Sequence, residues 1–397
     1  YFKDAVGRVR TEGRYRIFAP LERTAYTRAK HHGLHGNRQV TIWCSNDYLG
    51  MSQNELVINA LCETAQKYGA GAGGTRNIAG NSILHVQLEE KLARLHGKQA
   101  ALLFTSGYIA NEATLSTLAS ILPNCTIYSD ADNHASIIAG IRNARTKKHV
   151  FRHNDMAHLE ELLTQAPDDA TKLIACESLY SMDGDVAPLK DICDLADKYN
   201  ALTYVDEVHA VGLYGASGAG KAEELGIAER ISIIQGTLAK AFGLGGGYIS
   251  GDRVIIDAIR CFAPGFIFTT AMTLPIAAAA LTSVQHVSQT HSLRIRHQSQ
   301  VAKVKQGLQD RGLPLMTCST THIVPVFVGD PVKCKQITDI LQNEFAIYVQ
   351  PINYPTVPKG TERMRITPGP HHDDASIAHL LESLDAIWQR FDLPTLA

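Results

Sequence analysis

The sequence predicts an α/β protein with a mostly parallel central sheet that carries helices on both faces. Between about residues 99 and 251, short apolar runs of strand length alternate with longer segments of helical pattern, as is typical of parallel sheets buried on both sides. Hydrophobic residues make up 45% of the chain and charged residues 19%, as in ordinary globular proteins. After Pro264 long helical segments mix with short strands, which predicts a smaller C-terminal α+β domain.

We expect three parts along the 397 residues. Residues 1–50 form an N-terminal arm with a helix and a strand at 39–45. Residues 51–290 form the large domain, and residues 291–397 form the small C-terminal domain. A chain of this length can bury a sizeable core in one large and one smaller domain.

The apolar runs define the individual elements. Runs at 99–106, 125–130, 172–184, 201–210, 231–243 and 246–251 each contain a strand, and helices are expected at 107–121, 134–145 and 188–200. Further along, helices are expected at 274–289, 291–312, 331–345 and 373–390, and strands within 322–329, 345–351 and 363–369.

Charge and cysteine content exclude several classes of function. The net charge of -1 supplies no broad basic field, which argues against binding to nucleic acid or a membrane surface. No apolar run reaches the roughly 18 residues of a membrane span. Eight cysteines without CxxC spacing favour a reducing compartment. The chain begins at Tyr1 and not at Met, so a leader sequence removed before Tyr1 remains an alternative. We expect a cytoplasmic protein.

In open parallel sheets the ligand site lies at the carboxyl ends of the strands. The polar residues that end the predicted strands are therefore candidates for binding or catalysis: Ser106, Asp130, Glu177, Asp206 and Thr237.

The stretch "GTLAKAFGLGGG" places Lys240 among small and apolar residues. Desolvation there lowers the pKa of a lysine, and a neutral amine can form a Schiff base with an aldehyde. Pyridoxal phosphate (PLP) is such an aldehyde. It also needs a carboxylate at its pyridine nitrogen, donors for its phosphate and a group that covers its ring.

Three further stretches supply these groups. Asp206 ends the strand in "YVDEVHAVG" and can pair with the pyridine nitrogen. Ser106 and Gly107 open a helix directly after a strand, so that free N–H groups form an anion site, and Thr237 can add a hydroxyl. His134 begins the next helix and can stack on the ring. Each residue considered alone has a structural alternative. Asp206 could simply cap a helix, Ser106 could be an ordinary helix N-cap, and His134 could cap the helix that it begins.

Two other patterns are weaker. "GASGAGKA", residues 215–222, matches a phosphate-binding loop except that Ala222 replaces the hydroxyl residue which holds magnesium. The histidine clusters "HHGLH" and "PHHDD" lack the spacing of a zinc helix. We interpret both clusters as solvated loops and expect no metal.

The chain resembles the α-oxoamine synthases, which are fold-type I PLP-dependent transferases that join an amino acid to an acyl-CoA with loss of carbon dioxide. The resemblance covers nearly the full length. It is carried by "TEGRYR", "NDYLGM", "GAGAGGTRNIAG", "ESLYSMDGD", "YVDEVHAVGLYG", "APGFIFTT" and "VQPINYPTVPKGTERMRITPGP".

The resemblance implies roles for the cofactor residues. Lys240 would bind PLP and move protons at the substrate α-carbon, Asp206 would pair with the pyridine nitrogen, and His134 would stack on the ring. The remaining cofactor residues would be His209 and Ser181 near the phenolic oxygen, Thr237 with the turn Ser106, Gly107 and Tyr108 at the phosphate, and Thr269 and Thr270 from the neighbouring subunit. The active site would therefore lie at the interface of a homodimer.

The resemblance also implies the substrates. Asn46 and Arg365 would hold the carboxylate of glycine, since a guanidinium fork suits a planar carboxylate. Succinyl-CoA carries a free carboxylate that needs a cation and short donors. The positions that match this pocket are Arg16, Thr75, Asn77, Ile78 and Thr356. A member of the family that prefers acetyl-CoA is the alternative, and an exposed surface arginine is the alternative for Arg16 alone.

One departure from the family is visible. The residue before the lysine is usually glycine, and here it is Ala239. The added methyl group can reshape the turn slightly, but it gives no reason to doubt that Lys240 reacts with an aldehyde.

Overall fold

The computed structural model describes residues 1–33 and 36–395. By the contacts among its residues, the chain divides into two compact units. The first comprises Tyr1–Gly50, Ser181–Asp185 and Ser292–Ala397, and the second comprises Met51–Tyr180 and Val186–His291. The N-terminal segment therefore shares its contacts with the C-terminal part of the chain.

The second unit is built on a seven-stranded sheet with the order β4-β10-β9-β8-β7-β5-β6. Its strands are β4 (Ala100–Phe104), β5 (Thr126–Asp130), β6 (Lys147–Phe151), β7 (Lys172–Glu177), β8 (Ala201–Asp206), β9 (Ile233–Thr237) and β10 (Gly247–Gly251). All neighbours from β9 to β6 run parallel, whereas β10 is antiparallel to β4 and β9. The predicted, mostly parallel sheet is confirmed. Strand β10 is reversed because residues 238–246 are too few for the crossover that parallel neighbours need.

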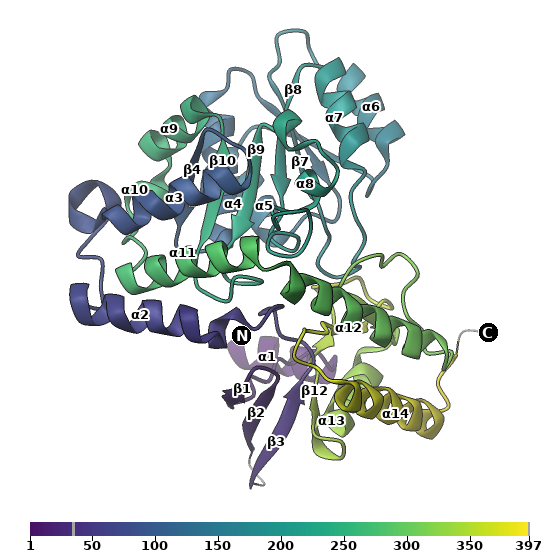
Figure 1. The fold of residues 1–397 in the computed structure, drawn as a ribbon. Coiled ribbons are helices and arrows are strands. Elements are labelled where there is room, and N and C mark those ends of the chain that lie inside the picture. The colour runs from purple at the N-terminus through teal and green to yellow at the C-terminus, as the bar shows by residue number, and fades with distance from the viewer. Residues whose placement is uncertain (34–35, 396–397) are drawn as a thin grey trace. The chain divides into compact units, whose positions relative to one another are not determined.

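Helices cover both faces of this sheet (Figure 1). The helices of the second unit are α2 (Glu55–Tyr68), α3 (Ile83–Leu95), α4 (Gly107–Ile121), α5 (Ala135–Ala144), α6 (Met156–Thr164), α7 (Leu189–Lys198), α8 (Lys221–Glu224), α9 (Arg253–Phe262), α10 (Pro264–Ile267) and α11 (Leu274–Gln289). On β7, Leu173 and Ala175 belong to a core cluster with α4 and α5, while Ile174 and Cys176 belong to a cluster with α6 and α7. This two-sided burial explains why the strands are apolar at successive positions.

The first unit contains two small sheets and several helices. Its strands are β1 (Leu21–Ala25), β2 (Arg28–Gly33), β3 (Gly36–Ile42) and β12 (Ile347–Tyr348) in one sheet, and β11 (Val324–Phe327), β14 (Arg363–Ile366) and β13 (Pro351–Ile352) in the other. Its helices are α1 (Phe2–Thr11), α12 (His291–Gln309), α13 (Pro331–Asn343) and α14 (Asp374–Phe391). The expectation of one strand before residue 50 is wrong, because β1 and β2 are also present. Their sequences, "LERTA" and "RAKHHG", are too polar to show a strand pattern.

Within residues 1–33 and 36–395, no helix combines the length and the apolar character that crossing a membrane requires.

Candidate functional site

Polar residues gather at the carboxyl edge of the seven-stranded sheet. Asp130, Glu177, Asp206 and Thr237 are the last residues of β5, β7, β8 and β9, and Ser106 is the N-cap of α4, just beyond β4. Glu177 and Asp206 are direct partners across β7 and β8. The structure thus places the strand-end residues where the sequence predicts them.

Asp206 is a buried carboxylate with two protein donors. Its exposed fraction is 2%. Asn111 Nδ2 donates to Oδ2 at 2.7 Å, and the backbone N–H of Val208 donates to Oδ1 at 2.8 Å. Burial raises the pKa of Asp206, and these two hydrogen bonds and the charge of Lys240 oppose the rise. Each oxygen keeps acceptor capacity for a further donor.

Lys240 lies in the turn between β9 and β10. It is partly exposed and follows the exposed Ala239, and the lowered pKa expected for the lysine stays a prediction. The small residues of the turn also allow close packing: a Cβ on Gly243 would lie 2.2 Å from the backbone nitrogen of Ser52. Since Ala239 does not have a positive φ, its methyl group adds no backbone strain.

The N-terminus of α4 forms a cradle with β9 and β10. Ser106 caps the helix and accepts a hydrogen bond from the backbone of Ile109 at 3.2 Å. A Cβ on Gly247 would lie 2.5 Å from the nitrogen of Gly107, and one on Gly107 would lie 3.5 Å from Thr237 Oγ1. The glycines therefore let three backbone segments meet where the N–H groups of a helix start attract an anion.

Two other residues of the expected phosphate site differ in their surroundings. The Thr237 hydroxyl donates to the carbonyl of Gly246 at 2.9 Å and accepts from the N–H of Ala239 at 3.1 Å. Tyr108, in the first turn of α4, is exposed. The roles of both residues at a phosphate stay predictions.

His134 is the N-cap of α5 and is exposed. Its backbone N–H donates to Glu177 Oε1 at 2.6 Å. Desolvation lowers the pKa of the His134 ring, the charge of Lys240 acts in the same direction, and Asp206 opposes both. Burial and the neighbouring Asp206 raise the pKa of Glu177 well above its usual range.

The two residues expected at the phenolic oxygen belong to different units. His209 follows β8 in the second unit and is 4% exposed. Ser181 belongs to the first unit, where its carbonyl accepts from Arg365 Nη1 at 3.4 Å. Their shared role stays a prediction.

The first unit contains a buried arginine fork. Because side chains alternate along a strand, Arg363 and Arg365 of β14 lie on one face, while Met364 and Ile366 enter the core on the other. Arg365 Nη2 donates to Asn46 Oδ1, although 319 residues separate the two. The structure thus brings together the two residues expected to hold the glycine carboxylate.

The residues expected at the acyl carboxylate fall into two groups. In the first unit, Arg16 Nη2 donates to Thr356 Oγ1 at 3.2 Å, and 340 residues separate them. In the second unit, Thr75 Oγ1 donates to Asn77 Oδ1 at 2.8 Å, and Ile78 is 78% exposed. Each group thus contains one hydrogen-bonded pair, Arg16 with Thr356 and Thr75 with Asn77.

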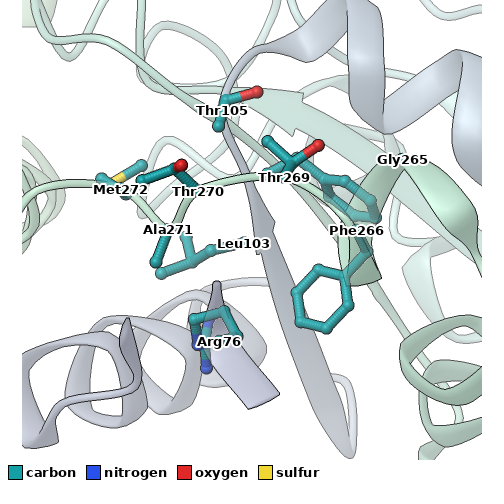
Figure 2. A pocket seen from close by; sticks show the side chains of 10 residues that line it. Arg76, Leu103, Thr105, Gly265, Phe266, Thr269, Thr270, Ala271 and Met272 are labelled. Atoms are coloured by element: carbon teal, nitrogen blue, oxygen red, sulfur yellow. The ribbon is translucent and has the colours of Figure 1, made fainter. Parts of the chain in front are cut away.

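Thr269 and Thr270 line a pocket with Arg76 and Phe266 (Figure 2). Thr270 pairs with Thr75 in an isolated antiparallel bridge. The Arg76 guanidinium already donates to both oxygens of a carboxylate, that of Glu89, at 2.8 and 2.9 Å. The charge of Arg76 is therefore already paired with that of Glu89. The hydroxyls of Thr269 and Thr270 are hydrogen-bonding groups of the pocket lining.

The nucleotide-loop alternative fails on hydrogen bonding. In the stretch 215–222, Glu223 accepts from the N–H groups of Ser217 and Ala219 at 2.9–3.1 Å. Glu207 Oε1 accepts from the N–H of Ala222 at 2.7 Å. Two internal carboxylates thus occupy the donors that a nucleotide phosphate would need.

The interpretation of the histidine clusters as solvated loops is wrong for "PHHDD". His372 is 2% exposed and stacks on Trp43 with ring centroids 3.7 Å apart, and His371 stacks on Tyr26 at the same distance. In "HHGLH", the first two histidines lie on β2, and residues 34–35 lie outside the described residues. Among the described residues, no three His, Cys, Asp or Glu side chains are grouped as metal ligands.

Sequence reasoning missed the second layer around Asp206. Asn111, Ser136 and Tyr204 are all buried and joined by hydrogen bonds. The only signal was a polar residue within the apolar helix "GYIANEATL".

These groups fit pyridoxal phosphate. Asp206 is buried with acceptor capacity to spare, Lys240 lies within electrostatic reach of it, and the cradle at Gly107 and Gly247 would be filled by a Cβ. A carboxylate, an amine and an anion cradle at one sheet edge are the groups that this cofactor requires.

Comparison with known proteins agrees with this donor set. Residues 38–384 match the family described as aminotransferase class I and II. The chain is 58% identical to a 5-aminolevulinate synthase of Bradyrhizobium diazoefficiens over 99% of this chain and 97% of the relative. It is 53% identical to one of Rhizobium meliloti over 98% and 97%.

Solved structures give the same fold. A serine palmitoyltransferase from S. paucimobilis with a bound PLP–myriocin aldimine matches with a TM-score of 0.92 and 29% identity, over 98% of this chain and 97% of the other. The chain therefore belongs to the class I and II aminotransferase family and, within it, to the 5-aminolevulinate synthases.

Proposed function

We propose that this PLP-dependent enzyme condenses glycine with succinyl-CoA and releases 5-aminolevulinate, CoA and carbon dioxide. The observation that carries the proposal is the set of buried or cradled groups at the sheet edge, in a chain that is 58% identical to a 5-aminolevulinate synthase. When bound, PLP supplies an electron sink for the charge that develops at the glycine α-carbon.

Residues of the second unit, with Ser181 from the first, would hold and tune the cofactor. Lys240 would hold it covalently, and its amine would then move the proton at the glycine α-carbon. Asp206 would pair with the pyridine nitrogen and keep it protonated, and His134 would stack on the ring. Ser106, Gly107, Tyr108 and Thr237 would bind the phosphate, and His209 and Ser181 would contact the phenolic oxygen.

The residues of the first unit recognise the amino acid. Arg365 presents its planar fork to the glycine carboxylate, and Asn46 adds a polar contact. Because Arg365 is 8% exposed, water screens its charge weakly, and the carboxylate gains more from the pair than it would at the surface.

The carboxylate of succinyl-CoA distinguishes it from other acyl donors. We assign Arg16 and Thr356 as its partners, with Thr75, Asn77 and Ile78 completing the pocket. The hydrogen bond between Arg16 and Thr356 supports this, because it orients a guanidinium beside a small hydroxyl donor.

We further propose a homodimer in which Thr269 and Thr270 serve the neighbouring subunit's phosphate. Two large apolar side chains that precede these threonines in the sequence are exposed, Phe262 at 65% and Phe268 at 81%. Exposed apolar side chains of this kind support an interface in this segment. The cytoplasmic location and the domain boundaries near residues 50 and 290 stay predictions.

Isotope labelling tests the reaction. Glycine carrying carbon-13 at its carboxyl carbon should yield labelled carbon dioxide and unlabelled 5-aminolevulinate. Glycine labelled at its α-carbon should yield labelled 5-aminolevulinate. Retention of the carboxyl label in the product would contradict a decarboxylating condensation.

A further inference from the structure

Asn111 lies at the centre of a hydrogen-bonded unit that the proposed reaction does not yet use. It is 1% exposed on α4. Its Nδ2 donates to Asp206 Oδ2 at 2.7 Å and to Ser136 Oγ at 2.9 Å, and its Oδ1 accepts from the Tyr204 hydroxyl at 2.7 Å. Every polar atom of this amide therefore has a partner.

The orientation of the Asn111 amide is fixed by chemistry. Nδ2 faces Asp206 Oδ2, and this carboxyl oxygen accepts its hydrogen bond. The Tyr204 hydroxyl then donates to Oδ1. A reversed amide would place two acceptor oxygens against each other in a buried site, which is costly.

Ser136 continues the unit to His134. The backbone N–H of Ser136 lies 3.2 Å from His134 Nδ1, and its hydroxyl lies 2.7 Å from the same atom. A backbone N–H can only donate, so Nδ1 is an acceptor and carries no proton. The ring proton of neutral His134 is therefore on Nε2.

We infer that Asn111 and Ser136 are positioning residues that join Asp206 and His134 into one unit, in which Asp206 Oδ2 accepts from Asn111 and His134 stays neutral with its proton on Nε2. The inference rests on the proposed function, because Asp206 and His134 are the groups assigned to the cofactor ring. Hydrogen bonds run in one direction, from Tyr204 through Asn111 and Ser136 to His134. This order would hold the His134 ring in its neutral form, with the proton on Nε2, before the cofactor binds.

The charged and titratable groups around the His134 ring agree with this assignment. They are Asp206, Lys240 and Glu177, the last through the backbone N–H of His134. Of these, Lys240 favours the neutral ring and Asp206 favours the charged ring. The two hydrogen bonds that Nδ1 accepts from Ser136 also favour the neutral ring, because both are lost when Nδ1 takes up a proton.

Nuclear magnetic resonance of the full chain without PLP tests the unit directly. Histidines are labelled with nitrogen-15, and the His134 signals are assigned by their loss in His134→Gln. We expect a neutral ring with Nδ1 unprotonated. In Ser136→Ala the ring should take up its second proton at a higher pH, because one donor to Nδ1 is gone.

One control and one further variant make the test specific. The control is Ser116→Ala, on the same helix α4 as Asn111. It removes a hydroxyl whose hydrogen bonds go to carbonyls of its own helix, and it should leave the His134 titration unchanged. Asn111→Leu should weaken PLP binding roughly tenfold or more, since a hydrogen bond to a charged group is lost. If Asn111→Leu does not fold, Ser136→Ala alone decides the question.

Two results would refute the inference. One is a His134 ring with a proton on Nδ1 near neutral pH, and the other is a His134 titration that Ser136→Ala leaves unchanged. Failure of the wild-type enzyme to form 5-aminolevulinate would refute the proposed function and leave this measurement intact.

Discussion

Replacing Arg16 by leucine should remove the selectivity for a free acyl carboxylate. The informative comparison is between succinyl-CoA and butyryl-CoA, which differ chiefly in that a methyl group replaces the carboxylate. Arg16 and Thr356 are 3.2 Å apart and exposed, so solvent screens their charge–dipole contacts. A hydrogen bond to a charged group at the lower end of its range is worth about 1.5 kcal/mol. We therefore expect the ratio of kcat/KM for the two thioesters to fall about tenfold.

The assay follows CoA release with saturating glycine and either thioester. Arg14→Leu is the matched control, because Arg14 pairs with Glu12 and not with Thr356. Any effect of Arg14 on the CoA moiety would act on both thioesters equally. An Arg16→Leu enzyme whose preference for succinyl-CoA stays unchanged would refute the assignment.

Three further predictions follow from the same geometry. Lys240→Ala should abolish product formation and the visible absorbance band of bound PLP, and a normal rate would refute the assignment. Gly247→Ala should lower folding stability by about 1–3 kcal/mol and weaken PLP binding, because its Cβ would lie 2.5 Å from the nitrogen of Gly107. Gly245→Ala, with nothing within 4 Å of its Cβ, should change neither. Burial raises the pKa of Glu207 from 4.5 to about 6, so its contribution to stability is present below pH 4.5 and is lost as the pH rises through about 6. Between those limits, urea unfolding should show the wild type losing about 2 kcal/mol relative to Glu207→Gln, and parallel curves for the two proteins would contradict this.

The large sheet could be predicted because its strands are buried on both faces. Alternate residues such as Leu173 and Ile174 enter different core clusters, and this leaves a continuous apolar run in the sequence. β1 and β2 could not be predicted, because they are polar strands of a small sheet and leave no such run. Their existence depends on pairing with β3, which is a tertiary property.

The site could be predicted where chemistry coincides with a strand end. Asp206 and Thr237 follow this rule, since parallel strands end at the same edge. The exposure of Lys240 could not be predicted, because desolvation depends on what covers a turn and not on the size of its neighbours. Asn111 was also out of reach: its partner Asp206 lies 95 residues away, and no local pattern marks such a pair.

The arginine pairs show the remaining limit. Arg365 meets Asn46 across 319 residues, and Arg16 meets Thr356 across 340. Only the resemblance to a family could connect these positions beforehand, since neither spacing nor periodicity relates them.

The acyl-CoA preference of the wild-type enzyme tests the central claim most directly. CoA release is measured with glycine and a panel of succinyl-CoA, acetyl-CoA and longer acyl-CoAs, and the product is identified by mass spectrometry. We predict the highest kcat/KM for succinyl-CoA and 5-aminolevulinate as its product. A preference for acetyl-CoA, with 2-amino-3-oxobutyrate as the product, would contradict the proposed function.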